Sequence, residues 1–312
     1  MTSTEYQPCV GFPHGYVRIR PEARRQLVGG ALVVLSTAAI AVVPTLARFA
    51  YDGGSNTLTV ITSRSIVTAI CCFLVVIALR RPFAIGRGAL GISLGLGVLY
   101  AVHLYGLLES VHYLPVNMVI LIFYLHPMIV GVMAILAGRE TMGWKSFGAL
   151  VAALVGLGLA VGFSFGALNF FGVTLVLMAA AIAAVVIIGG SHAMKNCDSL
   201  VVTYYMMLSA AVTLATFGLV QGGVDWPATL SGWVGCSGVA IAYTIGTITF
   251  FAAIPLLGAV RAAMISNLEP VLGILFAMAV LGETVSPLQG LGIVTVIGSI
   301  FAMEAGRRPA RS

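Results

Sequence analysis

Ten long apolar runs dominate this sequence, and they constrain its fold more than any other feature. A helix that crosses a bilayer needs about 20 consecutive apolar residues. Runs of this length recur along the chain with only short connections between them. The predicted spans are 27–48, 57–79, 89–109, 113–137, 146–164, 169–192, 200–221, 231–255, 258–281 and 286–304. Continuous runs of this kind favour helices over the short alternating strands of a barrel, so we predict an all-α integral membrane protein.

The distribution of charge supports this prediction and gives an orientation. Only 8% of the residues are charged, against roughly a quarter in soluble proteins. If the N-terminus is cytoplasmic, fourteen of the sixteen Lys and Arg residues fall on the inner side, as the positive-inside rule requires. We therefore expect a multi-pass protein of a bacterial inner (cytoplasmic) membrane, with both termini cytoplasmic. The cations lie in separate short loops, so we expect a lipid bilayer and no nucleic acid as the large partner.

An internal repeat relates the two halves of the chain. A shift of 143 residues carries Tyr100 onto Tyr243 and Pro127 onto Pro270. Each half would contain five spans, and an odd number means that the second half enters the membrane upside down. Inverted repeats with a substrate site near the midplane are typical of secondary transporters. The sequence therefore predicts ten transmembrane helices in two inverted five-helix repeats.

The repeat also divides the chain. We expect an N-terminal cytoplasmic tail over 1–26, a first repeat over 27–164, a second repeat over 165–304 and a C-terminal cytoplasmic tail over 305–312.

The sequence resembles the EamA-type transporters of the drug/metabolite transporter superfamily. The resemblance covers about residues 27–304, and its most specific part is LEPVLGILFAMAVLGETVSPLQGLGIVTVIGSIFA at 268–302. The first half carries a looser copy, LHPMIVGVMAILAGRE, and Arg64 in TSRSIVTAI is similar to the arginine of the family's second helix. The resemblance implies ten helices around a central cavity. It also implies transport, often export, of amino acids or other small metabolites.

Two ionisable residues within the predicted spans are the first candidates for a site. An unpaired charge in the middle of a membrane helix costs at least about 2.5–3.5 kcal/mol, and such residues usually face the interior and serve function. We interpret Glu269 as a proton-coupling or substrate-binding carboxyl, with Ser266 and Gly273 on the same helical face. The alternative is a structural group bonded to backbone N–H groups or to Arg64. Arg64 would bind a substrate carboxylate or Glu269, or form a structural salt bridge.

His126 precedes Pro127 in the fourth span as Glu269 precedes Pro270 in the ninth. Its charge can change near neutral pH, so it could share protons with Glu269; the alternative is a packed, hydrogen-bonded histidine. Asn117 lies nine residues earlier, on roughly the opposite face of an ideal helix. Both can line a cavity only if the helix breaks between them.

The remaining candidates are helix breaks and aromatic side chains. Pro127 and Pro270 each remove one backbone donor, and we expect kinks or hinges that also shape a cavity. Tyr100 and His103 share a face of the third span, and Tyr243 lies in the eighth. These three could line the cavity, although membrane proteins often use tyrosine for packing or at the interface.

Motifs of other functional classes are missing or weak. There is no Walker loop, HExxH motif or dinucleotide fingerprint, so we expect no cofactor, no metal and no ATP hydrolysis within this chain. GFSFG at 162–166 fits G-x-S-x-G, but a nucleophile elbow needs a strand–turn–helix context. Gly148, Ala152, Gly156 and Ala160 recur every four residues, which favours close packing in the bundle, with dimerisation as the alternative.

The function predicted from the sequence is secondary transport without enzymatic activity. We expect export of a small polar metabolite, such as an amino acid, by alternating access and coupled to protons. The alternatives are an uncoupled facilitator, an intramembrane enzyme that uses Ser164 or the histidines, and a scaffold. The sequence does not settle the oligomeric state.

Overall fold

The fold is all-helical in the part of the chain that the structure describes. The computed structural model describes residues 22–136, 144–161, 169–195, 197–220, 223–281 and 286–305. The first half contains α1 (Glu22–Ala41), α2 (Val43–Asp52), α3 (Thr57–Ala78), α4 (Arg87–Ser110), α5 (Val116–Phe123), α6 (His126–Leu136) and α7 (Trp144–Val161). The second half contains α8 (Phe170–Ala193), α9 (Ser199–Val220), α10 (Leu230–Leu257), α11 (Ala259–Ile265), the 3-10 helix η1 (Ser266–Leu268), α12 (Glu269–Leu281) and α13 (Pro287–Ala305).

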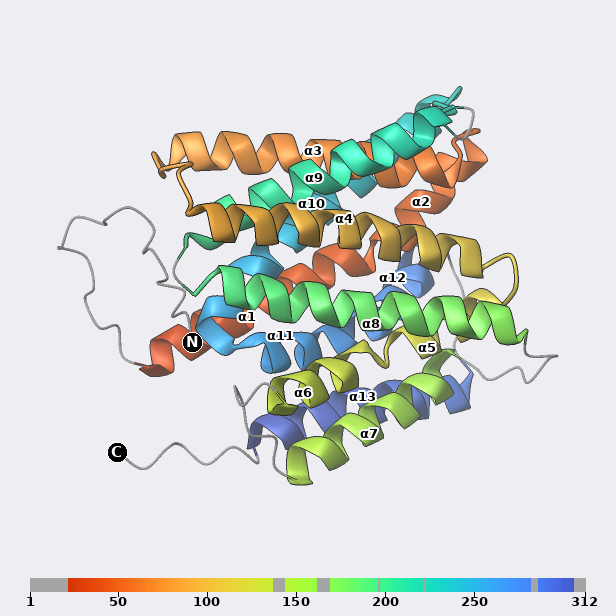
Figure 1. Ribbon diagram of the computed structural model, residues 1–312. Helices are drawn as coiled ribbons and strands as arrows, with labels where there is room; N and C mark the ends of the chain where they lie inside the picture. Colours follow the sequence, from red (N-terminus) through yellow and green to blue (C-terminus); the bar gives the residue numbers. More distant parts are fainter. Residues whose placement is uncertain are drawn as a thin grey trace.

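These helices make up the ten predicted spans. Within the described ranges, eight helical segments are long and apolar enough to cross a membrane, and two shorter apolar helices, 147–160 and 287–299, supply the fifth and tenth spans. The helices run side by side, and α1 begins at the end of the bundle where α13 ends (Figure 1). The predicted fold class, ten transmembrane helices in two inverted five-helix repeats, is confirmed.

Three spans are broken into shorter helices. The fourth span breaks after Phe123 and the ninth breaks at η1, so Pro127 and Pro270 each lie second in the helix that follows the break. A proline is tolerated there because the N–H groups of a first helical turn have no partner within the helix. The first span also breaks, at Val42, with Pro44 in the first turn of α2. This third break was not predicted from the sequence, although Pro44 interrupts the apolar run in the same way.

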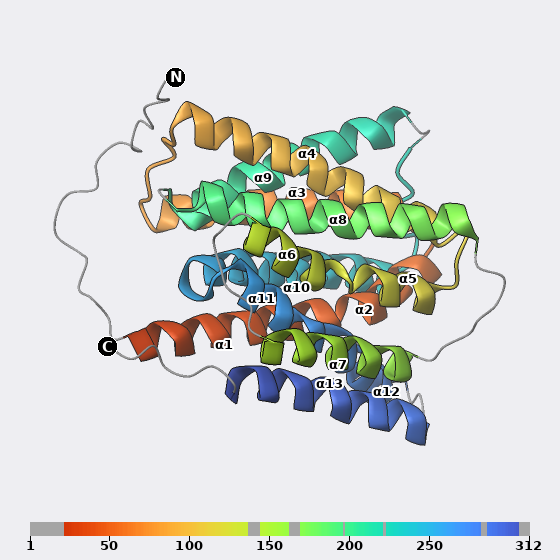
Figure 2. The same ribbon diagram turned by 60° about the horizontal axis from the view of Figure 1, so that its bottom comes forward.

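The helices pack with approximate twofold symmetry, and most of their contacts join one half to the other. Two spans pack on their own counterparts, since α7 packs on α13 and α3 packs on α9. Other contacts come as exchanged pairs, because α1 packs on α10 as α4 packs on α8. Figures 1 and 2 show α7 and α13 together along one edge, with α3 and α9 on the opposite side. The interface between the halves therefore runs through the centre of the molecule.

Small residues allow the closest helix crossings. A Cβ added at Gly156 of α7 would lie 2.9 Å from the Cβ of Thr295, and one added at Gly292 of α13 would meet the backbone of Ala160. The backbones can approach this closely only because both glycines lack a side chain. An added Cβ at Gly148 would meet nothing within 4 Å. The four-residue spacing of small residues in the fifth span thus serves packing within the bundle at Gly156.

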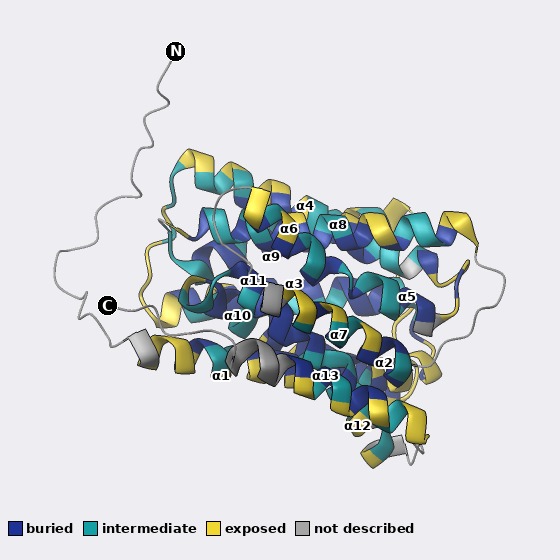
Figure 3. Ribbon diagram, turned by 90° about the horizontal axis from the view of Figure 1, so that it is seen from below, coloured by how far each residue is buried: buried dark blue, intermediate teal, exposed yellow. Residues whose placement is uncertain are grey.

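The surface of the bundle is apolar, as lipid requires. Large hydrophobic side chains such as Phe170 and Leu230 are more than 80% exposed, and Figure 3 shows exposed residues along the outer helices around a buried centre. Many hydroxyl groups inside the spans donate to a carbonyl one turn earlier, as Ser65 does to Ile61 and Thr203 does to Ser199, each at 2.7 Å. These bonds satisfy the polar groups where no water is available.

Polar contacts join the two halves at both ends of the bundle. At one end, Arg81 and Asp198 form a salt bridge of 3.3 Å between the loops that precede α4 and α9. At the other end, the side-chain amide of Asn56 donates to Asp225 at 2.8 Å, while its oxygen caps α3 through the N–H of Thr59 at 2.7 Å. These contacts connect loops that lie far apart in the sequence.

Candidate functional site

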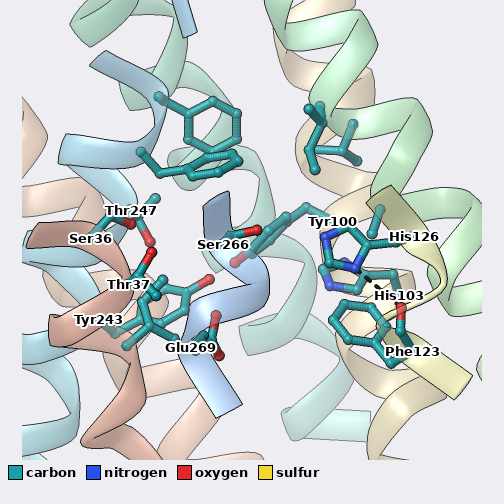
Figure 4. A pocket seen from close by; sticks show the side chains of 16 residues that line it. Ser36, Thr37, Tyr100, His103, Phe123, His126, Tyr243, Thr247, Ser266 and Glu269 are labelled. Carbon is teal, nitrogen blue, oxygen red and sulfur yellow. Dashed lines mark hydrogen bonds between the residues drawn. The ribbon is translucent and has the colours of Figure 1, made fainter. Parts of the chain in front are cut away.

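A cavity lies between the two halves of the bundle, and it is the candidate functional site (Figure 4). Its volume is about 140 Å³, below the roughly 300–1,000 Å³ of pockets that hold drug-sized ligands. Spans one, three and four of the first half line it together with the equivalent spans six, eight and nine of the second. The lining residues are Ser36, Thr37, Ile40, Tyr100, His103, Phe123, His126, Ala183, Val186, Ile187, Tyr243, Thr247, Phe250, Phe251, Ser266 and Glu269.

Several lining residues hold equivalent positions in the two repeats. The shift of 143 residues that relates the halves also relates these members of the cavity wall. The equivalent pairs are Ile40 and Ala183, Tyr100 and Tyr243, Phe123 and Ser266, and His126 and Glu269. The symmetry of the fold thus carries equivalent positions to one cavity, but only the tyrosine pair has kept the same residue.

One side of the cavity carries a carboxyl and several hydroxyls, and we call it the acid wall. Its members come from α1, α10, η1 and α12 and lie on the left in Figure 4: Ser36, Thr37, Tyr243, Thr247, Ser266 and Glu269, with Ser266 nearest the centre. The hydroxyl of Ser36 donates to the carbonyl of Gly246 at 2.7 Å, and the lack of a side chain on Gly246 allows α1 to approach α10 here. This crossing brings α1 to the cavity.

Glu269 is half-buried and is the first residue of α12. Its carboxyl lies within hydrogen-bonding reach of the hydroxyl of Tyr124, which follows α5 in the opposite half. No residue in the described ranges forms an ion pair with Glu269 within 4 Å. A carboxyl in an apolar bundle with one hydroxyl partner retains the capacity to accept a proton or bind a cation.

Arg64 supports the acid wall from outside the cavity. Its guanidinium carbon lies 4.1 Å from the centre of the Tyr243 ring, a cation–π contact. Arg64 does not line the cavity, and it forms no ion pair with Glu269 among the described residues. Within the described residues, its Nε atom is buried without a hydrogen-bond partner. A buried polar group without a protein partner is usually satisfied by ordered water.

The opposite side of the cavity is aromatic, and we call it the histidine wall. Its members come from α4, α5 and α6 and lie on the right in Figure 4: Tyr100, His103, Phe123 and His126. The rings of His103 and Phe123 stack at 6.1 Å and 10°, and the rings of Tyr100 and His103 meet edge to face at 4.8 Å. His126 contacts the carbonyl of Phe123 through Nδ1 at 3.1 Å. The break after α5 leaves this carbonyl free for the bond.

The structure brings together most of the residues expected from the sequence. Five of them line the cavity: Tyr100, His103, His126, Tyr243 and Glu269. Arg64 contacts the outer side of the Tyr243 ring, which lines the cavity. Pro127 and Pro270 follow His126 and Glu269 directly, at the starts of α6 and α12. Asn117 lies in α5, and its side chain is outside the part of the chain described. Ser164 also falls outside that part.

Several lining residues were missed by the sequence analysis. Ser36 and Thr37 are polar residues in the middle of the first apolar run, so their pattern offered a signal that was not used. Phe123, Thr247, Phe250 and Phe251 offered none, because aromatic residues and threonines are common throughout the spans. Tyr124 was missed because only the folded structure brings it to Glu269.

The arrangement suits reversible binding of a small molecule or a proton. In the ranges described, no three His, Cys, Asp or Glu side chains come together in a group that could hold a metal ion. The cavity instead combines one carboxyl, hydroxyls, two imidazoles and apolar surface. Few directed polar groups within an apolar lining are typical of ligand pockets.

Comparisons with known proteins agree with this architecture. The model of the EamA-like transporter family matches residues 27–162 and 170–304. No curated protein matches the chain. A solved structure described as "Crystal structure of protein" is similar over 91% of this chain and 99% of its own, with a TM-score of 0.73 and 17% identity. At that identity the likeness supports the fold alone.

Proposed function

The chain belongs to the EamA-like transporter family, and we propose that it is a secondary transporter that exports a small metabolite, such as an amine or amino acid, by alternating access. The single observation that carries this proposal is the cavity at the interface of the two halves. Equivalent spans of both repeats line it, so a rocking motion of one half against the other would open it to alternate sides of the membrane.

Glu269 would couple transport to protons in this proposal. Its carboxyl lies on the cavity wall and has no ionic partner among the described residues, so a proton and a cationic substrate would compete for the same group. Exchange between the two would couple the fluxes in opposite directions. His126 faces the same cavity at the equivalent position and is the second candidate for proton exchange.

The broken helices would supply the motion. The breaks in the fourth and ninth spans precede His126 and Glu269 by at most three residues. Binding or release of a ligand at these two residues would therefore affect the backbone next to both breaks. A few residues at an element's end often absorb the backbone change of a hinge. We therefore propose that the segments before Pro127 and Pro270 are hinges.

The distribution of cations supports the proposed orientation. α4, which begins with Arg87, starts at the end of the bundle where α1 starts, and α8 ends there (Figure 1). Arg81 precedes α4 in the chain and Lys195 follows α8, so this would be the cytoplasmic end. We propose a bacterial inner membrane, cytoplasmic termini, a first repeat over 27–164 and a second over 165–304.

Reconstituted transport tests the proposal. The purified protein is placed in liposomes, and efflux of candidate metabolites is measured with and without a pH gradient. We expect the gradient to drive net flux in the native protein, and Glu269→Gln to abolish this coupling. Asp225→Asn is the matched control, because it makes the same carboxyl-to-amide change at the end of the bundle, and it should keep native coupling.

The outcomes separate coupled from uncoupled transport. Gradient-driven flux that persists unchanged in Glu269→Gln would contradict the coupling role of this residue. Flux that follows only the metabolite gradient in the native protein would identify a facilitator. No flux of any metabolite under either condition would contradict transport itself.

A further inference from the structure

The chemistry of the cavity wall points to a specific class of substrate, and this inference rests on the proposed function. We propose that the cavity binds a small organic cation, an amine with an apolar body, in preference to a zwitterionic amino acid. The ammonium group would lie against the acid wall at Glu269, and the apolar body would fill the rest of the cavity.

The charged groups on the wall have one sign. Glu269 is the acidic residue of the lining, and the described lining contains neither Lys nor Arg. Arg64 contacts the ring of Tyr243 from outside the lining. A substrate carboxylate would therefore enter an apolar cavity without a guanidinium or ammonium partner on the wall. An unpaired buried charge is strongly unfavourable, so the wall selects against an anionic group.

An ammonium group would supply the partner that Glu269 lacks. The carboxyl has the hydroxyl of Tyr124 within hydrogen-bonding reach and no ion pair among the described residues. A carboxylate has two oxygens and roughly four acceptor positions, so most of its capacity remains for a ligand. Charge-assisted hydrogen bonds from an ammonium are about twice as strong as neutral ones.

The histidine wall also presents an acceptor. His126 approaches the carbonyl of Phe123 through Nδ1, and a carbonyl oxygen can only accept, so Nδ1 carries the proton of that bond. In a neutral imidazole the other nitrogen, Nε2, is then an acceptor. A ligand with a second donor, such as a hydroxyl, would satisfy it, whereas a carboxylate would not.

Aromatic rings favour a cation in the same space. Tyr100, Phe123, Phe250 and Phe251 line the cavity, whereas the ring of Tyr243 already contacts the Arg64 guanidinium. The face of an aromatic ring attracts a positive charge, and aromatic cages are a common way to bind ammonium groups. The same rings and the aliphatic residues of α8 would bury an apolar body, and the removal of apolar surface from water favours binding.

Matched pairs of ligands test the inference directly. Leucine and 3-methylbutylamine share a side chain and an amine and differ by the carboxylate, and 3-methylbutanol lacks the charge. Binding of each to the purified full-length protein is measured by isothermal titration calorimetry. We expect 3-methylbutylamine to bind at least about tenfold more tightly than the other two. Glu269→Gln should abolish this preference, and Asp225→Asn should keep it.

Each other outcome overturns the inference and leaves the proposed function to its own test. Leucine that binds as tightly as the amine would show that a carboxylate is accepted, most simply by the histidine wall. Equal binding of 3-methylbutanol would show that charge is not recognised, and no binding of the amine would contradict the cation site. Efflux of leucine from liposomes would still support transport, and absence of all flux would instead contradict the proposed function.

Discussion

The fourth and ninth spans have the same backbone plan but present different side chains to the cavity. In both, one helix ends in the membrane, a short break follows, and a second helix begins one residue before a proline. The ninth span presents Ser266 and Glu269, where the fourth presents Phe123 and His126. The two spans therefore have a helix break and an ionisable residue at equivalent positions, but the ionisable groups differ in their chemistry.

The repeat preserves the positions of the helix breaks, whereas ligand binding depends on the side chains that line the cavity. A symmetric pair of broken helices is sufficient to build a cavity that can open to both sides. A symmetric pair of carboxyls would put two like charges on facing walls, which is unfavourable in an apolar site. Glu269 and His126 occupy equivalent positions, so the backbone remains symmetric. The two walls still differ chemically, with the carboxyl on one and aromatic rings on the other.

Exchange of the two ionisable residues is the strongest challenge to this comparison. We expect Glu269→His alone to lower transport at least about 100-fold, because the ammonium group of the substrate would lose the carboxylate that pairs with it in the cavity, and loss of one partner of a buried charge pair costs about 3–5 kcal/mol. The double variant with Glu269→His and His126→Glu should recover about tenfold, since the carboxyl returns at the equivalent position. Transport into liposomes measures both, and thermal unfolding of the purified variants checks that they fold.

The double variant decides whether the walls are interchangeable. Tyr124, within reach of Glu269, has Asn267 as its equivalent. The Oδ1 atom of Asn267 is buried without a hydrogen-bond partner in the described residues, and the amide of an asparagine side chain can donate to a carboxylate. A folded double variant as inactive as Glu269→His alone would show that the backbone symmetry does not extend to function.

Removal of the Tyr124 hydroxyl tests how the first half supports the carboxyl of the ninth span. Tyr124→Phe removes the hydrogen-bonding partner that the first half offers to Glu269. Hydrogen bonds to charged groups contribute about 1.5–3 kcal/mol, so we expect substrate affinity to fall about tenfold or more, measured by calorimetry. Tyr105→Phe is the matched control, because Tyr105 donates to Glu109 at 3.4 Å outside the cavity lining. An equal loss in both variants would contradict a specific role for Tyr124.

Replacement of the prolines should have the smallest effects, and equal ones. Pro127 and Pro270 lie in first helical turns, where no N–H donor is needed. We expect Pro127→Ala and Pro270→Ala each to lower the free energy of unfolding by about 0.4–1 kcal/mol, through greater freedom of the unfolded chain. Thermal unfolding of the purified proteins measures this. A large loss in only one variant would show that the two breaks are held by different contacts.

Much of the architecture could be predicted because hydrophobicity and charge act locally along the chain. The span count follows from run length, and the proposed orientation rests on the loop cations. Tyr100, His126 and Glu269 could be chosen because a costly residue inside an apolar run calls for an explanation. The break at Pro44 was equally visible in the sequence and was missed.

Contacts between residues far apart in the chain were decided only by the tertiary structure. The sequence marked Arg64 as an ionisable residue within a span, but its place behind Tyr243 depends on how α3 packs against α10. Likewise, Ser36 reaches the cavity because α1 crosses α10 at Gly246, and Tyr124 reaches Glu269 because the two halves meet there. Each span must be apolar to enter the membrane, so the spans can be recognised one by one from the sequence. Which faces of the helices contact one another depends on the packing of all spans together.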